Sequence, residues 1–195
     1  MKRYLYTSCL LFVPMTIFFG VVYPLLIWGF AQLSFPQKAE GSPLTVDGKV
    51  VGFRNIGQRF TTSGYLWGRP SAEEKEDAYL VSGGSNLSWS SSTLRIQVER
   101  REREVQSSLN DRTEEIPEDL IMASASGCDP DISLKAALMQ LPRISKERNV
   151  SILLLKELLT RYKEPEYLGL FPRRVNVLLF NLALDARYPI VGRDE

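Results

Sequence analysis

The sequence contains no histidine, and this absence narrows the chemistry open to the protein. A serine or cysteine nucleophile usually needs an adjacent base, most often an imidazole, although lysine and carboxylate alternatives exist. Two cysteines, Cys9 and Cys128, are too few for a disulfide framework or a metal cluster. The 24 basic and 23 acidic side chains nearly cancel, so there is no electrostatic case for nucleic acid. We expect no metal site and no nucleic-acid partner.

Charge is also absent from a long N-terminal stretch, the 34 positions from 4 to 37. Its centre, LLFVPMTIFFGVVYPLLIWGF, is apolar except for Thr16. A helix needs about 20 such residues to cross a bilayer, whereas a buried core helix rarely runs so far without a charge. We predict a short tail at 1–4, a transmembrane helix at 5–33, a linker at 34–43 and a soluble domain at 44–195.

The N-terminal stretch does not resemble a cleaved signal. A signal peptide has a shorter apolar region and a cleavage site of small residues, which GFAQLSF does not offer. A lipoprotein signal would place its cysteine after the apolar region, but Cys9 precedes most of it. The sequence therefore predicts an uncleaved anchor.

Four residues inside this anchor, Pro14, Gly20, Pro24 and Gly29, are unnecessary in a helix that only tethers a domain. Proline frees a backbone carbonyl, and small residues allow close packing against other membrane helices. They indicate a partner within the membrane.

The flanking charges favour a cytoplasmic N-terminus, because Lys2 and Arg3 precede the anchor. Lys38 and Lys49 near its other end weaken the bias. We expect the domain to lie outside the cytoplasmic membrane, in an extracytoplasmic position.

The remaining sequence indicates one mixed α/β domain, and the chain as a whole is of the α+β class. Asp47-Gly48 predicts a β-hairpin, and YLWGRPSA (residues 65–72) is typical of an aromatic strand that ends at its glycine and proline. Helices are expected at 92–109, from the end of DPDIS (129–133) to Pro142, and at 147–162. Residues 174–184 fit either a buried strand or a helix.

The stretch MASASGCDPDIS (122–133) admits two interpretations. Ser124, Ser126 or Cys128 could be a nucleophile on a tight turn, but no activating neighbour is identifiable. Asp129 is a suitable N-cap, and Pro130 fits the first turn of a helix. We favour a helix start over a catalytic elbow.

A second glycine-rich stretch, SGGSN (82–86), could let backbone amides approach an anion. It lacks the spacing of a phosphate-binding loop, and no lysine follows it. Alone, it is a weak signal.

Six short motifs, in order, together resemble the C subunit of the Kdp-type potassium-transporting ATPase (the KdpC family). They are YPLLIWGFAQLSFPQKAEGS, IGQRF with GRPSA, SGGSNL, IPEDLIMASASGCDPDIS, QLPRI and RVNVLLFNLALD. The resemblance covers nearly the whole chain. Where the family usually has leucine and histidine, this chain has Cys128 and Asp131.

The resemblance implies a non-catalytic, single-pass accessory subunit of a bacterial inner-membrane complex. Its partners would be a potassium pore-forming subunit and a P-type ATPase subunit. This chain lacks the Asp-Lys-Thr-Gly phosphorylation motif, and one span cannot form a potassium filter. The expected role is assembly and stability of the complex. Subunit contacts are expected at Gly20 and Gly29 through packing of the anchor, and at four polar residues within the matched motifs, Arg69, Asn86, Asp129 and Asn176.

A further proposal for this family is a catalytic chaperone that raises the ATP affinity of the pump subunit. By that proposal Ser82, Gly83, Gly84 and Ser85 would contact the nucleotide, and ATP would be the only cofactor, none being intrinsic. An extracytoplasmic domain would meet no ATP, so this conflicts with the orientation above. Two alternatives stay open: a membrane-anchored enzyme, and an anchored module that binds a small anion or nucleotide.

Overall fold

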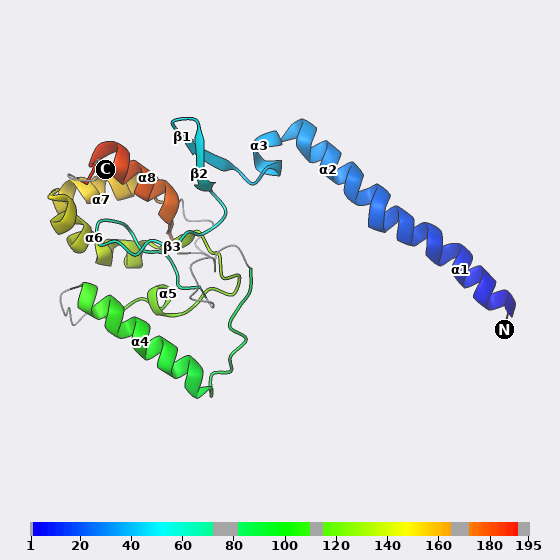
Figure 1. Ribbon diagram of the computed structural model, residues 1–195, viewed down its shortest axis with the longest axis horizontal. Helices are drawn as coiled ribbons and strands as arrows, with labels where there is room; N and C mark the ends of the chain where they lie inside the picture. Colours follow the sequence, from blue (N-terminus) through cyan, green and yellow to red (C-terminus); the bar gives the residue numbers. More distant parts are fainter. Residues whose placement is uncertain (1, 72–81, 110–114, 165–171, 191–195) are drawn as a thin grey trace. The chain divides into compact units, whose positions relative to one another are not determined.

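A computed structural model describes residues 2–71, 82–109, 115–164 and 172–190. The chain divides into two units, residues 1–51 and 52–195, which we describe separately. The first contains the apolar helix and a hairpin, and the second contains most of the remaining helices and a small sheet (Figure 1). One N-terminal apolar helix followed by a domain of helices and small sheets confirms the predicted α+β class.

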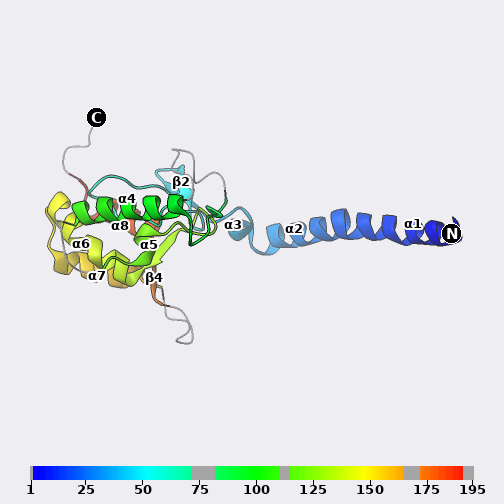
Figure 2. The same cartoon turned by 90° about the horizontal axis from the view of Figure 1, so that it is seen from below.

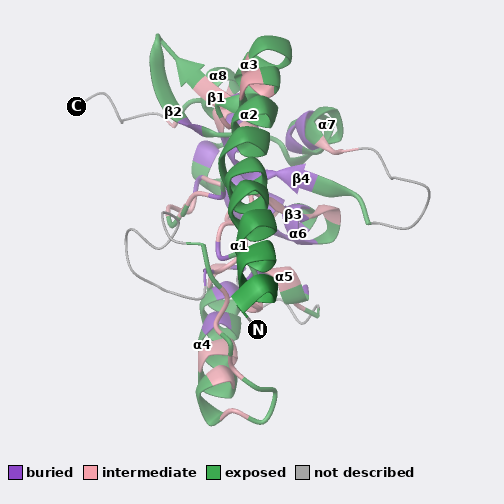
Figure 3. Ribbon diagram, turned by 90° about the vertical axis from the view of Figure 1, so that its right-hand side faces the viewer, coloured by how far each residue is buried: buried purple, intermediate pink, exposed green. Residues whose placement is uncertain are grey.

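The first unit begins with a helical stretch of 33 residues, from Lys2 to Ser34. It consists of α1 (Lys2–Ile17), a π-helical turn (Phe18–Val22) and α2 (Tyr23–Ser34). At 1.5 Å per residue it is about 50 Å long, more than a hydrocarbon layer of about 30 Å requires. Figure 3 shows it exposed along almost its whole length. An apolar helix with this exposure suits lipid or a membrane partner.

A short helix, α3 (Pro36–Ala39), and a hairpin follow. Strands β1 (Pro43–Val46) and β2 (Lys49–Phe53) pair with each other, as predicted. Asp47 and Gly48 in the turn both have positive φ, 50° and 75°. Such turns match the twist of the two strands, which is why Asp-Gly favours them.

The second unit is built around α6 (Leu134–Arg148), α7 (Ile152–Tyr162) and α8 (Val177–Arg187) (Figure 1). Helices α4 (Ser92–Ser108) and α5 (Glu118–Ile121) complete it, and α4 runs across the near face of the domain in Figure 2. Apolar side chains from these helices form one core with Leu66 and with residues of two short strands. Its fully buried members include Ile132, Leu141, Leu155, Phe180 and Leu184.

The small sheet joins two parts of the chain that lie far apart in sequence. Strand β3 (Asp131–Ser133) pairs antiparallel with β4 (Arg174–Asn176), with Ile132 opposite Val175. Both central side chains are buried, which fixes the register. Residues 174–184, for which strand and helix were both open, contain a strand and then a helix: β4 passes directly into α8.

Two predicted helix boundaries need correction. α6 does not end at Pro142 but continues to Arg148, so Glu147 does not begin the next helix. Asn149 ends α6 in the left-handed conformation, φ 52°, and the Ser151 hydroxyl caps α7. Pro142 predicted an early end, but α6 continues through it, and the polar residues of the stretch SKERN (145–149) form its last turn and its end.

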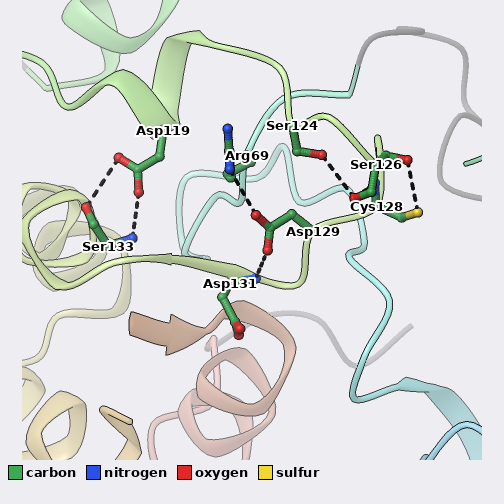
Figure 4. Close-up of polar contacts among 8 residues, drawn as sticks. All are labelled: Arg69, Asp119, Ser124, Ser126, Cys128, Asp129, Asp131 and Ser133. Atoms are coloured by element: carbon green, nitrogen blue, oxygen red, sulfur yellow. Dashed lines mark hydrogen bonds and ion pairs between the residues drawn. The ribbon is translucent and has the colours of Figure 1, made fainter. Parts of the chain in front are cut away.

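The predicted cap at Asp129 is also wrong. Strand β3 intervenes, and the N-cap of α6 is Ser133, whose hydroxyl accepts the Ala136 N–H. Ser133 in turn donates its N–H and hydroxyl to Asp119 of the preceding helix (Figure 4). The predicted helix at 92–109 is confirmed as α4, and Ser91 caps it.

Candidate functional site

Four motif segments meet at the loop between α5 and β3. We call residues 55–58, 69–71, 82–86 and 124–130 the loop cluster. Gly57 donates its N–H to the Cys128 carbonyl (2.9 Å), and Gly83 donates to the Ser126 carbonyl (2.8 Å). Ser124 donates its N–H to the Pro70 carbonyl (3.2 Å). Backbone hydrogen bonds thus join segments that lie far apart in the sequence.

Glycine is required in the loop cluster because the backbones approach so closely. A Cβ on Gly57 would lie 2.5 Å from the Asp129 carbonyl oxygen. Gly127 has φ +73°, and a Cβ there would lie 2.7 Å from the Gly83 carbonyl oxygen. Both distances are shorter than real Cβ contacts, so a side chain would force the loops apart.

An ion pair ties the GRPSA segment to the same loop. Arg69 Nη1 lies 3.0 Å from Asp129 Oδ2, and both side chains are about three-quarters buried (Figure 4). The other carboxylate oxygen of Asp129 accepts the Asp131 N–H at 3.1 Å, which forms a turn leading into β3. One carboxylate oxygen thus joins two segments, and the other stabilises the turn within its own segment.

Asn176 connects β3, β4 and the segment before IGQRF. Its amide donates to the Arg54 carbonyl (2.9 Å) and to Asp131 Oδ1 (3.1 Å), and its oxygen accepts the Leu179 N–H at the start of α8. Only 5% of Asn176 is exposed. Any contact with a partner subunit would therefore involve the surface that Asn176 supports more than the amide itself.

Asp131 occupies the position where the resembled family usually has histidine. Burial raises the pKa of its carboxyl, the negative charge of Glu164 raises it further, and the hydrogen bond from Asn176 opposes both. A carboxylate is thus held in surroundings that disfavour its charge.

The three candidate nucleophiles hold the loop together. The Ser124 and Ser126 hydroxyls lie 3.5 Å apart, and Ser126 Oγ accepts the Cys128 N–H at 3.3 Å. The Cys128 thiol donates to the Ser126 carbonyl (Figure 4). Within the described ranges, these hydrogen bonds bring no lysine or carboxylate to any of the three. Ser124, Ser126 and Cys128 therefore stabilise the conformation of the loop.

The SGGS loop packs against the same turn. The Ser82 hydroxyl and the Gly83 N–H both donate to the Ser126 carbonyl, at 3.0 and 2.8 Å. A Cβ on Gly84 would lie 3.0 Å from the Ala125 carbonyl oxygen, and Ser85 Oγ accepts the Leu87 N–H. Asn86, next in sequence, has φ 52°. Two groups that could cradle a phosphate therefore already have partners within the chain.

A second group of polar residues, which sequence reasoning missed, holds the segment just before the loop cluster. The backbone of Leu66 pairs with a side chain: its N–H donates to Asn181 Oδ1 (2.8 Å), and its carbonyl accepts from Asn181 Nδ2 (2.9 Å). Gln140 does the same for Trp67, at 2.9 and 3.1 Å. Residues 65–71 thus form no strand of a sheet, contrary to the prediction, because two side-chain amides replace the neighbouring strand.

Two buried arginines extend this arrangement. Arg148 donates to the Gly64 carbonyl (2.7 Å), the Tyr188 carbonyl (2.7 Å) and Asp185 Oδ1 (2.8 Å). Arg143 donates to the carbonyls of Ser63 and Tyr65. Burial lowers the pKa of the Arg143 guanidinium to about 10, so it stays charged at neutral pH. We call Gln140, Arg143, Arg148, Asn181 and Asp185 the backbone clamp.

A signal for the clamp was present in the sequence. The motif QLPRI contains Gln140 and Arg143, and FNLALD contains Asn181 and Asp185. Asp185 is exposed, whereas Gln140, Arg143 and Asn181 interrupt helices that are otherwise apolar on their inner faces. Such residues must find a buried partner, but the sequence does not say which one.

Beside the clamp, Trp67, Arg69 and α4 line a hollow of about 480 Å³. Its described lining includes Arg59, Arg69, Arg100 and Arg101 against one acidic residue, Glu104. Arg101 is 4% exposed and donates to the carbonyls of Ile121 and Ser71. The hollow is therefore basic, and Ser82 to Ser85 are not among the described residues that line it. No group of three or more Cys, Asp or Glu side chains in the described ranges could hold a metal ion.

The comparisons with known proteins agree with the motifs. The family described as "KdpC: K+-transporting ATPase, c chain" matches residues 5–186. A Potassium-transporting ATPase KdpC subunit from Janthinobacterium sp. (strain Marseille) is 41% identical, over 96% of this chain and 100% of that protein. The KdpC subunit from Nitratidesulfovibrio vulgaris is 45% identical over 84% of this chain and 84% of that protein. The KdpC subunit from Leptospira interrogans is 37% identical over 94% of this chain and 94% of that protein. The match spans both units, the apolar helix and the domain with its loop cluster and clamp, and this chain belongs to the KdpC family of potassium-transporting ATPase c chains.

Proposed function

We propose that the chain is the single-pass accessory subunit of a high-affinity, ATP-driven potassium import complex in a bacterial inner membrane. Its task is to assemble and stabilise a pore-forming subunit and a P-type ATPase subunit. The observation that carries the proposal is the family match over residues 5–186, which covers the apolar helix and the domain together. A subunit that joins membrane partners needs both parts.

The anchor supports a contact role because its apolar surface is exposed. A Cβ added to Gly20 or Gly29 would meet nothing within 4 Å, so another helix can approach the backbone at both points. Lys2 and Arg3 favour a cytoplasmic N-terminus, which places the domain outside. This orientation and the limits of the membrane-crossing part at 5–33 are part of the proposal.

In the domain, the proposed contact surface is the loop cluster. Arg69 and Asp129 are partly exposed there and already paired with each other, and Asn86 lies in the neighbouring SGGSN segment. Such a rigid, internally bonded surface presents a fixed shape and loses little conformational freedom on binding. The contact roles of Arg69, Asn86, Asp129 and Asn176 follow from this surface.

The experiment is growth at limiting potassium of a host strain that lacks this chain. We expect the wild-type chain to restore growth and a Gly20→Leu, Gly29→Leu double variant to restore it poorly, since two leucines would hold a partner helix away. Circular dichroism of the purified variant should show an unchanged domain. Normal growth without any version of the chain would refute the assembly role.

A basic hollow favours a second candidate, an anion-binding function. The four arginines around Trp67 could attract a phosphate or carboxylate group, including the phosphates of ATP that the family proposal invokes. Thermal unfolding of the full chain in detergent, with pyrophosphate or ATP, tests it. If pyrophosphate or ATP stabilises the wild-type chain but not Arg59→Gln, the anion-binding function is favoured. If the stabilisation is lost only in Gly83→Ala, nucleotide binding at the SGGS loop is favoured.

A further inference from the structure

The π-helical turn in the middle of the anchor, with the proline that follows it, leaves the Phe19 carbonyl without a backbone donor in the helix. In an α-helix the Phe19 carbonyl would accept the N–H of Tyr23, four residues on. Here Tyr23 donates to the Phe18 carbonyl instead. In the π-helical pattern the donor to Phe19 would be residue 24, which is Pro24 and has no N–H.

This carbonyl lies where water cannot satisfy it. Helix α1 places 16 residues before the π-helical turn, and α2 places 12 after it. At 1.5 Å per residue, the turn is about 18 to 24 Å from either end of the helix. That position is near the middle of a hydrocarbon layer about 30 Å thick, where an unsatisfied polar group is costly.

The turn itself offers no side-chain donor. The side chains of Phe18–Val22 are all apolar or absent. Gly20, next to the carbonyl, leaves the backbone uncovered, with nothing within 4 Å of a Cβ position. Pro14 removes a second donor, from the Leu10 carbonyl, but α1 stays α-helical there and the site is nearer to one end of the helix.

We propose that the Phe19 carbonyl accepts a hydrogen bond from a membrane-spanning helix of a partner subunit. That helix presents a hydroxyl, amide or indole donor at the level of the bilayer centre. The inference rests on the proposed function, because it requires a partner subunit in the membrane. It adds the atom that makes the contact and the chemistry of the side chain that meets it.

The test compares Pro24→Ala with Pro14→Ala in the full chain, purified with its partner subunits in mild detergent. Pro24→Ala restores an N–H that can cover the carbonyl within the helix, so the partner loses its acceptor. We expect retention of partner subunits, titrated against detergent, to weaken about 3-fold to 30-fold, the range of hydrogen bonds between membrane helices. Pro14→Ala, the same change in regular helix, should stay close to wild type.

The outcomes separate the two proposals. A wild-type chain that retains no partner subunit contradicts the proposed function and this inference with it. Retention by Pro24→Ala equal to wild type, or equal weakening by both variants, contradicts this inference alone.

A second measurement does not depend on the behaviour of the variants. A photoreactive benzoylphenylalanine at position 23, beside the uncovered carbonyl, should cross-link to a partner helix within one turn of a Ser, Thr, Asn, Gln, Tyr or Trp residue. Cross-links only to lipid, to a second copy of this chain, or to a helix segment without such a donor would overturn the inference.

Discussion

Residues 2–34, in the anchor, and residues 61–71, beside the domain core, satisfy their backbone polar groups in different ways. The anchor satisfies its backbone groups within its own helix, apart from the positions that proline disturbs. The second stretch forms no regular element, and side chains of α6 and α8 satisfy it. The backbone hydrogen bonds of the anchor are local, whereas those of residues 61–71 depend on residues that are distant in the sequence.

This difference separates the two tasks that we assign to the units. A helix that satisfies most of its own backbone groups can leave its surface free for a membrane partner. A segment held from outside cannot shift without breaking several buried hydrogen bonds, so the clamp keeps the loop cluster in one shape. The clamp would therefore support the contact surface that we propose.

The largest expected effect comes from breaking the clamp at Arg148. Its side chain is fully buried and binds Gly64, Tyr188 and Asp185, so Arg148→Met leaves polar partners unsatisfied while it keeps a similar length. We expect a loss of about 3–5 kcal/mol in the free energy of unfolding. Chemical denaturation of the full chain in detergent measures it.

Arg103→Met is the control for that change, because Arg103 is exposed on α4. It should alter stability by no more than about 0.5 kcal/mol. If Arg148→Met lowers the free energy of unfolding no more than Arg103→Met does, the clamp does not hold residues 61–71 in place.

A smaller effect is expected in the loop cluster itself, from Gly127→Ala. The positive φ and the 2.7 Å approach to the Gly83 carbonyl oxygen both oppose a side chain. We expect a loss of about 1–3 kcal/mol. Gly83→Ala is a matched control, since a Cβ there meets nothing within 4 Å. Equal stability of the two variants would mean that the loops can separate freely.

The smallest effect concerns pH. Because the pKa of Asp131 is raised in the folded protein, folding favours its protonated form, and stability decreases as pH rises from the unfolded value of about 3.8 through the folded pKa. Asp131→Asn removes this dependence and keeps an oxygen for Asn176. We expect it to stabilise the protein near pH 7 by at most about 1 kcal/mol, after allowance for solvent screening.

The comparison for Asp131 is the melting temperature of both proteins at pH 3 and pH 7. The melting temperatures of the wild type and Asp131→Asn should differ only at pH 7. An equal difference in melting temperature at pH 3 and pH 7 would show that the charge of the carboxylate does not cause the difference.

The same contrast explains what the sequence could and could not predict. The anchor, the Asp47-Gly48 turn and α4 depend on neighbouring residues, and local patterns identified them. The end of α6 at Asn149 depends on one left-handed residue after a polar stretch, whereas the proline rule predicted an end at Pro142, which α6 passes. The extended stretch around Leu66 could not be assigned, because its partners are the side chains of Gln140 and Asn181.

The candidate site divides in a similar way. The motifs led to the residues of the loop cluster, since Arg69, Asp129 and the glycines all lie there. Their internal partners were beyond reach of the sequence, because pairing Gly57 with Cys128 or Arg69 with Asp129 requires the fold. The cap assigned to Asp129 was wrong for that reason.

The most direct test of the account is affinity capture of the tagged full chain from detergent-solubilised membranes of its host, grown at limiting potassium. Mass spectrometry then identifies the proteins that accompany it. We predict recovery of a large multi-span pore protein and a P-type ATPase in stoichiometric amounts. Recovery of this chain alone, from membranes that contain both of those proteins, would contradict it.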